Sequence, residues 1–529
     1  MNSRIFLIFL GLVGIFSCTK DFEKINENPN DPIIVEADFL LTTSIFETMN
    51  LFGGEMNRVV FFNYTNHFSG FNGQFQRYTF DPRGVDDYWE EIYVNCLQPV
   101  HQVVETYKED PTYNNRVAIA GIWKAYIFSN TVSIWGSIPK SRALNGDPNV
   151  PYDKEEDVYY SLLEELKILA ESIHLDGDTY SANADKIYGG DLLKWKKFAN
   201  TLRLRLAMRI SEADSEVARS VVQEIYQDEQ NTINSVDETA SANWGTTSDT
   251  WSHLYDRAVY NRNANLATMP VLNEALVYHT APYGDPRLEV YAQVATEGPM
   301  EGEYFGQNTS YGGGEEFAGD IVNPHEGLKQ TDYSQIGERF LKPEAEYVFL
   351  SYAESSFLKA EAALRGWWGN GNAEQYYYEG IDASFKHYGL SETQANNYKN
   401  TPGIQWGTAS ETAGRTAEFQ DWLQIASSAI PEGDHFRQII MQHWLAIPGQ
   451  GIDAWALIRR TRVLEFQPQF STYDGNYAYV PNRLPYPGSE YATNTQAVEK
   501  AVTWIEGPDD LWTKLWFALP IVPNPNLPY

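Results

Sequence analysis

The sequence predicts a mainly α-helical protein whose helices alternate with long irregular loops. Apolar residues recur every three or four positions in several segments, which places them on one stripe of a helix. Aromatic stretches rich in Gly and Asn separate these segments and are too long to be simple connectors. With 529 residues and 43% apolar composition, the chain can bury a core that is stable without disulfides.

The first residues have the features of an export signal. A short basic start precedes an apolar run from Ile5 to Phe16, which is too short to span a bilayer because a span needs about 20 residues. Residues 15–18 resemble the lipobox of bacterial lipoproteins, although Phe16 stands where a small residue is usual. We therefore expect a lipoprotein signal peptide over residues 1–17 and lipidation of Cys18. The alternative is an ordinary secretory signal, but no A-x-A-like cleavage site lies nearby.

Residues 18–35 are expected to form an extended tether. They are polar, and Pro29 and Pro32 disfavour helix in the residues before them. The acidic start at Asp21 resembles the signal that sends lipoproteins to the cell surface in Bacteroidetes-type bacteria. A folded body over residues 36–529 would then be anchored at the outer membrane by lipid, exposed on the cell surface.

The charge balance restricts the possible partners. The chain has 39 Lys plus Arg against 71 Asp plus Glu, a formal net charge of −32. Nucleic acid is therefore excluded as an expected partner, and attachment to an anionic membrane should depend on acyl chains rather than on a basic face. Plain solubility of an exported protein is the alternative explanation of the acidity. Because the only other cysteine is Cys96, lipidation of Cys18 leaves it without a disulfide partner.

Two segments in the first half of the body have helical periodicity. Residues 157–173 and 192–210 each carry apolar side chains at intervals of three or four. In the second segment a basic cluster falls largely outside the apolar stripe, and it consists of Lys196, Lys197, Arg203 and Arg205. We expect this cluster to be a solvated or acid-paired helix face rather than an anion site.

A helix pair is predicted further along the chain. Residues 351–365 and 373–388 have helical spacing, and a Gly- and Trp-rich turn at 366–371 separates them. The unit is about 35 residues long, which is the size of a tetratricopeptide repeat. Small alanines beside Phe357 would permit close helix packing.

The long loops are the predicted binding face. Segments 69–83, 242–265 and 301–320 combine aromatic rings with amide side chains, which suits neutral polar ligands such as sugars or peptides. The alternative is that the rings pin the loops onto the core. The residues predicted to contact the ligand are Phe75, Tyr78, Trp244, Trp251, Tyr304 and Tyr311.

Signals for an enzyme or a cofactor are poor. The nine histidines show no close metal-ligand spacing, and neither a G-x-S-x-G elbow nor a P-loop occurs. We therefore expect no catalytic residues, no bound metal and no cofactor. A glycosidase with an unrecognised carboxylate pair is the alternative. Asp176, Asp178 and Asp185 could ligate calcium, but a turn is favoured because the spacing does not match an EF-hand.

An ordered series of motifs carries a resemblance to a known family. The motifs are at residues 21–29, 134–139 (Ile-Trp-Gly-Ser-Ile-Pro), 188–200, 202–209 (Leu-Arg-Leu-Arg-Leu-Ala-Met-Arg), 285–288 (Asp-Pro-Arg-Leu), 351–365, 440–446, 453–455, 459–460 and 481–487. Over essentially the whole mature chain, the sequence resembles the SusD/RagB family of nutrient-binding outer-membrane lipoproteins, especially its SusD-like second subgroup.

The resemblance implies a single helical domain built on tetratricopeptide-like helix pairs, with irregular loop-rich segments as the ligand face. It also implies a partner, a TonB-dependent barrel transporter of the SusC type, to which the protein would pass captured oligosaccharides or, in some members, peptides. We favour a glycan ligand. The motif residues are expected to pack or cap helices rather than to locate the ligand, and they include Trp135, Gly136, Trp195, Arg203, Arg205 and Arg365.

Overall fold

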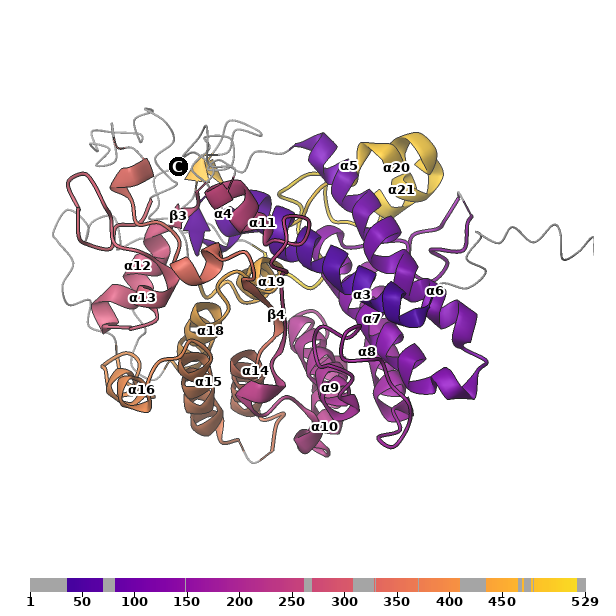
Figure 1. The fold of residues 1–529 in the computed structure, drawn as a ribbon, viewed down its shortest axis with the longest axis horizontal. Coiled ribbons are helices and arrows are strands. Elements are labelled where there is room, and N and C mark those ends of the chain that lie inside the picture. The colour runs from indigo at the N-terminus through magenta and orange to yellow at the C-terminus, as the bar shows by residue number, and fades with distance from the viewer. Residues whose placement is uncertain are drawn as a thin grey trace, which may run out of the picture.

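Packed helices make up the body of the protein (Figure 1). The computed structural model describes residues 36–520, except residues 70–80, 148, 261–268, 308–327, 329, 370, 410–433, 465–468, 471–476 and 479. The predicted signal peptide, the lipidation site Cys18 and the tether lie outside the described residues. As the sequence predicts, the fold is mainly α and forms one domain.

The α-helices range from single turns to the 22 residues of α7. In chain order they are α3 (Ala37–Thr48), α4 (Phe62–Thr65), α5 (Pro82–Glu91), α6 (Gln98–Tyr107), α7 (Asn114–Trp135), α8 (Glu155–Ser172), α9 (Leu192–Arg209), α10 (Ser215–Tyr226), α11 (His253–Tyr255), α12 (Glu274–Thr280), α13 (Leu288–Tyr291), α14 (Tyr352–Leu364), α15 (Ala373–His387), α16 (Glu392–Lys399), α18 (His435–Ala446), α19 (Gly451–Thr461), α20 (Gly488–Thr493) and α21 (Thr495–Val502). The π-helical segments are η2 (Met49–Glu55), η3 (Asn57–Phe61), η4 (Ile92–Leu97) and η8 (Asp256–Tyr260). The short 3₁₀ segments are η5 (Pro111–Tyr113), η6 (Glu229–Asn231), η7 (Val236–Glu238), η10 (Ala281–Tyr283), η11 (Gln330–Asp332) and η12 (Glu338–Leu341).

Helices that follow one another in the chain lie side by side. The packing runs from α6 to α7, α8 and α9, then from α9 to α14 and on to α15 and α18. Of these helices, α8, α9, α14 and α15 form the row along the lower side of Figure 1. The predicted helices at 157–173 and 192–210 are confirmed as α8 and α9, and the predicted helix pair is confirmed as α14 and α15. Side-chain caps fix where α9 and α14 begin, since Asp191 accepts from the Lys194 N–H and Ser351 from the Glu354 N–H.

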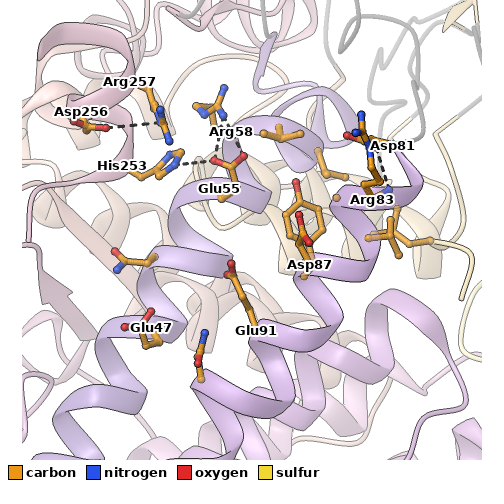
Figure 2. Close-up of a pocket in the computed structure, with 18 of the residues that line it drawn as sticks. Glu47, Glu55, Arg58, Asp81, Arg83, Asp87, Glu91, His253, Asp256 and Arg257 are labelled. Carbon is orange, nitrogen blue, oxygen red and sulfur yellow. Dashed lines mark hydrogen bonds and ion pairs between the residues drawn. The ribbon is translucent and has the colours of Figure 1, made fainter. Parts of the chain in front are cut away.

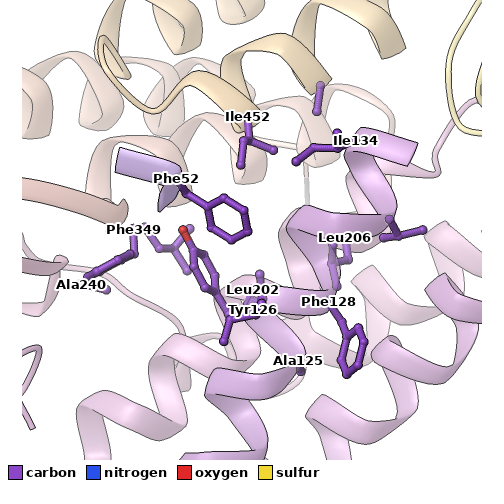
Figure 3. Packing of buried hydrophobic residues seen from close by; sticks show 14 of the residues in the cluster. Phe52, Ala125, Tyr126, Phe128, Ile134, Leu202, Leu206, Ala240, Phe349 and Ile452 are labelled. Carbon is purple, nitrogen blue, oxygen red and sulfur yellow. The ribbon is translucent and has the colours of Figure 1, made fainter. Parts of the chain in front are cut away.

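Helix α7 runs through the centre of the core. Together with η5 it is apolar and long enough to cross a membrane, but 89% of its apolar window is buried inside the protein, so we assign it to the core. Figure 3 shows side chains from five elements converging beside it: Tyr126 and Phe128 of α7, Leu202 and Leu206 of α9, Phe52 of η2, Phe349 of the strand before α14, and Ile452 of α19.

The strands are short and occur in antiparallel pairs. They are β1 (Phe68–Ser69) with β3 (Val271–Leu272), β2 (Ala240–Asn243) with β4 (Glu346–Leu350), and β5 (Gln469–Phe470) with β6 (Tyr477–Ala478). Strand β4 leads directly into α14, so the β2–β4 pair ties the loop after β2 to the helix row. That loop carries residues of the candidate site.

The basic cluster of α9 is acid-paired. The Arg205 guanidinium lies 2.6 Å from a Glu354 carboxylate oxygen of α14. Arg203 is paired with Glu224 at 2.6 Å and Lys197 with Glu238 at 2.5 Å. These three cations are buried, so acid pairing is confirmed for them, whereas Lys196 is half-buried and makes no ion pair with a described residue.

Asp185 organises a turn. Its carboxylate oxygens accept hydrogen bonds from the backbone N–H groups of Ile187, Tyr188 and Gly190 and, at 2.7 Å, from the Trp195 indole. These four donors satisfy a carboxylate that is buried. Asp185 therefore lies in a turn, which is the structure that the sequence favours here.

The motif residues carry structural contacts, as expected. The indole of Trp135 donates to the Pro485 carbonyl at 3.1 Å. Gly136 ends α7 with a φ of 83°, which favours glycine. Arg365 lies 2.9 Å from Glu361 on its own helix and 2.5 Å from Glu212.

Candidate functional site

The first wall of the candidate site is a widened helix. Helix α3 continues into the π-helical segments η2 and η3, and such segments are frequent at functional sites. Gly53 and Gly54 lie in η2, where a Cβ atom on Gly54 would come 2.8 Å from His253. A Cβ atom on Gly53 would come 2.7 Å from the Tyr347 ring. The two glycines therefore let α11 and β4 approach the helix closely.

A cavity of about 820 Å³ opens beside this helix (Figure 2). This volume is in the range of small-molecule binding sites. Its walls come from α3, η2 and η3, from α5 with the start of η4, and from the segment around α11. The lining residues are Glu47, Asn50, Glu55, Arg58, Val59, Val60, Tyr64, Asp81, Arg83, Gly84, Val85, Asp87, Tyr88, Glu91, Asn95, Ser248, Trp251, His253, Asp256, Arg257 and Leu484.

Glu55 is the centre of a charged cluster at the cavity. Its carboxylate accepts hydrogen bonds from the Arg58 guanidinium at 3.1 and 3.2 Å and lies 2.7 Å from Nε2 of His253 (Figure 2). Burial acts to raise the pKa of Glu55, but His253 and Arg58 outweigh it and lower the pKa to about 2. Glu55 is therefore ionised near neutral pH and holds both partners in place.

A second group of acids lines the cavity without cationic partners. Glu47 of α3 and Asp87 and Glu91 of α5 make no ion pair or hydrogen bond with any described residue, and Figure 2 shows them below the Glu55 cluster. Burial raises the pKa of Glu47. Burial also raises the pKa of Glu91, and Glu47 and Asp87 raise it further. The wall therefore carries mutually repelling carboxylates.

Trp251 is the predicted ligand residue that lines the cavity. Its indole N–H donates to the Thr246 carbonyl at 2.9 Å. Its ring meets those of Tyr255 and Tyr260 edge to face, with centroids 5.2 and 4.7 Å apart. Trp251 is therefore part of a small aromatic group at the cavity.

The other predicted ligand residues do not line this cavity or are not described. Trp244 is 6% exposed, and its indole donates at 2.9 Å to Asn50, which does line the cavity. Tyr304 packs against the core away from the lining residues, and burial raises its pKa. Phe75, Tyr78 and Tyr311 lie outside the described residues. Ligand contact by these five residues stays a prediction.

Sequence reasoning missed most of the charged lining. It placed the site on loops, whereas Glu47, Glu55, Arg58 and Glu91 lie on helical segments. The Gly53-Gly54 pair inside an otherwise helical stretch was one available signal. Glycine in a helix interior lowers stability, so such a pair indicates a place where another element packs closely against the helix.

The fold and the cavity together define a class of protein, a helical single-domain protein with tetratricopeptide-like helix pairs and an open polar cavity. The sequence model of the SusD-like_2 family, described as starch-binding and associating with the outer membrane, matches residues 29–487. The chain belongs to this family.

Solved structures share the fold. A chitin-binding protein is 24% identical with a TM-score of 0.74, and the alignment covers 92% of this chain and 100% of that one. A chitin-binding SusD homolog from Flavobacterium johnsoniae is 21% identical with a TM-score of 0.74, over 91% and 98% of the two chains. A SusD homolog from Parabacteroides distasonis is 20% identical with a TM-score of 0.75, over 92% and 98%. A comparison with curated proteins gives no match.

Proposed function

We propose that the protein captures oligosaccharides in the cavity beside η2 and delivers them to a SusC-type TonB-dependent transporter in the outer membrane. The observation that carries this proposal is the cavity itself, about 820 Å³ in volume and lined by acidic, basic and amide side chains with Trp251 among them. Membership of a family described as starch-binding supports the same ligand class.

The chemistry of the lining suits a sugar. Sugar rings present apolar faces and hydroxyl edges, so they need a flat ring to stack on and several hydrogen-bonding groups around it. Because the indole N–H of Trp251 donates to the Thr246 carbonyl, the protein itself holds the ring in place, and the ring needs no hydrogen bond from the ligand to be oriented. Glu55, Arg58 and Asn50 then supply acceptors and donors for hydroxyl groups.

Membrane attachment completes the proposal. Lipid on Cys18 would hold the domain at the outer membrane, and residues 18–35 would give it the reach to meet a barrel transporter. Labelling cells with a radioactive fatty acid tests the anchor: label on the full chain and none on a Cys18→Ala variant is the expected result. Label retained by the variant would contradict it.

Calorimetry with purified protein tests the ligand class. We expect binding of oligosaccharides, and no shorter sugars should appear in the mixture after long incubation. Binding of peptides in place of sugars would favour the alternative that the protein is an oligopeptide-binding member of the family. Release of shorter sugars would contradict a purely binding role and favour a glycosidase.

Replacing Trp251 by alanine should weaken oligosaccharide binding by about 1–3 kcal/mol, a factor of roughly 5 to 150 in Kd. The loss is expected because the variant lacks the aromatic ring on which the sugar would stack. The indole N–H is bonded to the Thr246 carbonyl, so the ring face is the part of Trp251 that would contact the ligand. Titration calorimetry measures it, and Trp251→Phe should restore most of the affinity.

Trp504 provides the matched control for this variant. It is a half-buried tryptophan just after α21 that does not line the cavity, so Trp504→Ala should leave Kd unchanged. Equal affinity of the Trp251→Ala variant and the unaltered protein would remove Trp251 from the site.

A further inference from the structure

The cavity has an excess of negative charge. Six carboxylates line it against three guanidinium groups. Two of the guanidinium groups face carboxylates within the lining, Arg58 with Glu55 at 3.1 Å and Arg257 with Asp256 at 3.7 Å. The third, Arg83, stands at the start of α5, where its backbone N–H is bonded by Asp81. The remaining three carboxylates belong to the wall formed by Glu47, Asp87 and Glu91.

A tyrosine hydroxyl on the same wall also has no hydrogen-bond partner in the part of the chain that the structure describes. Tyr88 of α5 is only 8% exposed, and its hydroxyl makes no hydrogen bond with any described residue. Burial raises the pKa of Tyr88, so the hydroxyl stays protonated and can both donate and accept. The hydroxyl is therefore available to a ligand in the cavity that Tyr88 lines.

A bare metal ion does not fit this wall. No group of three His, Cys, Asp or Glu side chains close enough to hold a metal is found among the described residues. The cavity lining contains the amides of Asn50 and Asn95 as well as the carboxylates. Carboxylates together with amides suit an organic ligand that carries both positive charge and hydroxyl groups.

We propose that the preferred ligand of this cavity is an oligosaccharide with free primary amino groups, an oligomer of a deacetylated amino sugar, and that Glu47, Asp87 and Glu91 select it. The inference rests on the proposed function of the same cavity. An ammonium group offers three donors, which the carboxylates and the Tyr88 hydroxyl accept, while Asn50 and Asn95 bond to hydroxyl groups. The sugar ring stacks on Trp251.

Acidification should weaken this interaction. The groups that face Glu91 are Glu47 on α3, Glu55 on η2, Arg58 on η3, and Asp87 and Glu90 on its own helix. Because the pKa of Glu91 and that of Glu47 lie above the usual value, these acids become neutral early as the pH falls, while an amine stays charged. Affinity for the amino sugar should therefore fall at acid pH, and affinity for a neutral sugar should not.

Three hexamers of similar size test the inference by calorimetry on the lipid-free domain, at a pH low enough for the amines to be charged and high enough for the wall carboxylates to be ionised. The probes are a glucosamine hexamer, its fully N-acetylated form and a glucose hexamer. We expect the glucosamine hexamer to bind about tenfold or more tightly than either neutral hexamer, and added salt should reduce this preference. Glu91→Gln and Glu47→Gln should each cost about 2- to 5-fold for the glucosamine hexamer alone.

Glu171→Gln is the matched control, since Glu171 is an exposed acid on α8 that does not line the cavity, and this variant should bind the glucosamine hexamer as tightly as the unaltered protein. Equal or tighter binding of the neutral hexamers would overturn the inference and leave the proposed function standing. Failure of all three hexamers to bind would overturn the proposed function itself. If both Gln variants keep the full preference for the glucosamine hexamer over the neutral hexamers, Glu47 and Glu91 do not select the ligand. If a lysine hexapeptide binds more tightly than the glucosamine hexamer, the preferred ligand is not a sugar.

Discussion

Replacing Arg205 by alanine is expected to destabilise the protein by about 3–5 kcal/mol, because it leaves buried carboxylates without their counter-charge. Arg205 on α9 bonds to both carboxylate oxygens of Glu354 at 2.6 Å, lies 3.2 Å from Asp453 of α19 and donates to the Phe349 carbonyl at 2.7 Å. Glu354 is 1% exposed and Asp453 is 8% exposed. Burial acts to lower the pKa of Arg205, but Asp453 and Glu354 raise it above its ordinary value.

The free energy of unfolding in urea, measured for a double-mutant cycle, tests this prediction. Removing Arg205 alone should be costly, while Arg205→Met combined with Glu354→Leu should recover much of the loss because neither charge is then left buried. Arg142 is the control, since its pair with Asp147 is exposed and Arg142→Ala should cost at most about 1 kcal/mol. Additive effects in the cycle would contradict the coupling.

The same pairing explains where the net charge of the chain lies. Arg205, Arg209 and Arg287 are buried and each is paired with an acid inside the fold. The chain has 39 Lys plus Arg against 71 Asp plus Glu, and these three arginines are already paired inside the fold. The excess of acids is therefore left to the surface and to the cavity wall that Glu47 and Glu91 form.

The helices could be predicted from the sequence because their signal is local. The stripes that became α8 and α9 need only the spacing of apolar residues within one segment. The acid pairing of Arg205 could also be predicted, since a cation on a helix in a strongly acidic chain has many possible partners. Glu354 could not be predicted as that partner, because the two residues are distant in sequence and meet only when α9 packs on α14.

The candidate site was harder to predict because it is built across elements. Trp251 was predicted from the composition of its loop, and the structure places it in the cavity lining. Glu91 gave no such signal, since an acid on an amphipathic helix is ordinarily solvated. Its position against Glu47 depends on the packing of α3 beside η4, which no local pattern in the sequence encodes.

A rise in pH from about 4.5 to 7 should reduce the contribution of Glu155 to stability by on the order of 3 kcal/mol. Glu155 begins α8 and is 4% exposed. Its carboxylate oxygens accept from the backbone N–H groups of Trp516 at 2.9 Å and Phe517 at 3.3 Å, which holds the C-terminal segment against the core. Burial raises the pKa of Glu155 to about 7, against the lowering effect of those two hydrogen bonds.

The sign of the effect follows from proton binding. Between the two pKa values the folded protein keeps the proton of Glu155 and the unfolded chain has lost it, so the free energy of unfolding falls as the pH rises. Buried His67 and His443 act in the opposite direction, because burial lowers the pKa of each to about 3 and stability is lost as the pH falls below 6.5. The difference between the unaltered protein and Glu155→Gln isolates Glu155, since the histidines are common to both. Denaturant unfolding at several pH values should give a difference that shifts in favour of the unaltered protein on acidification. A difference independent of pH would show that the pKa of Glu155 is the same in the folded and unfolded states, which would contradict the prediction.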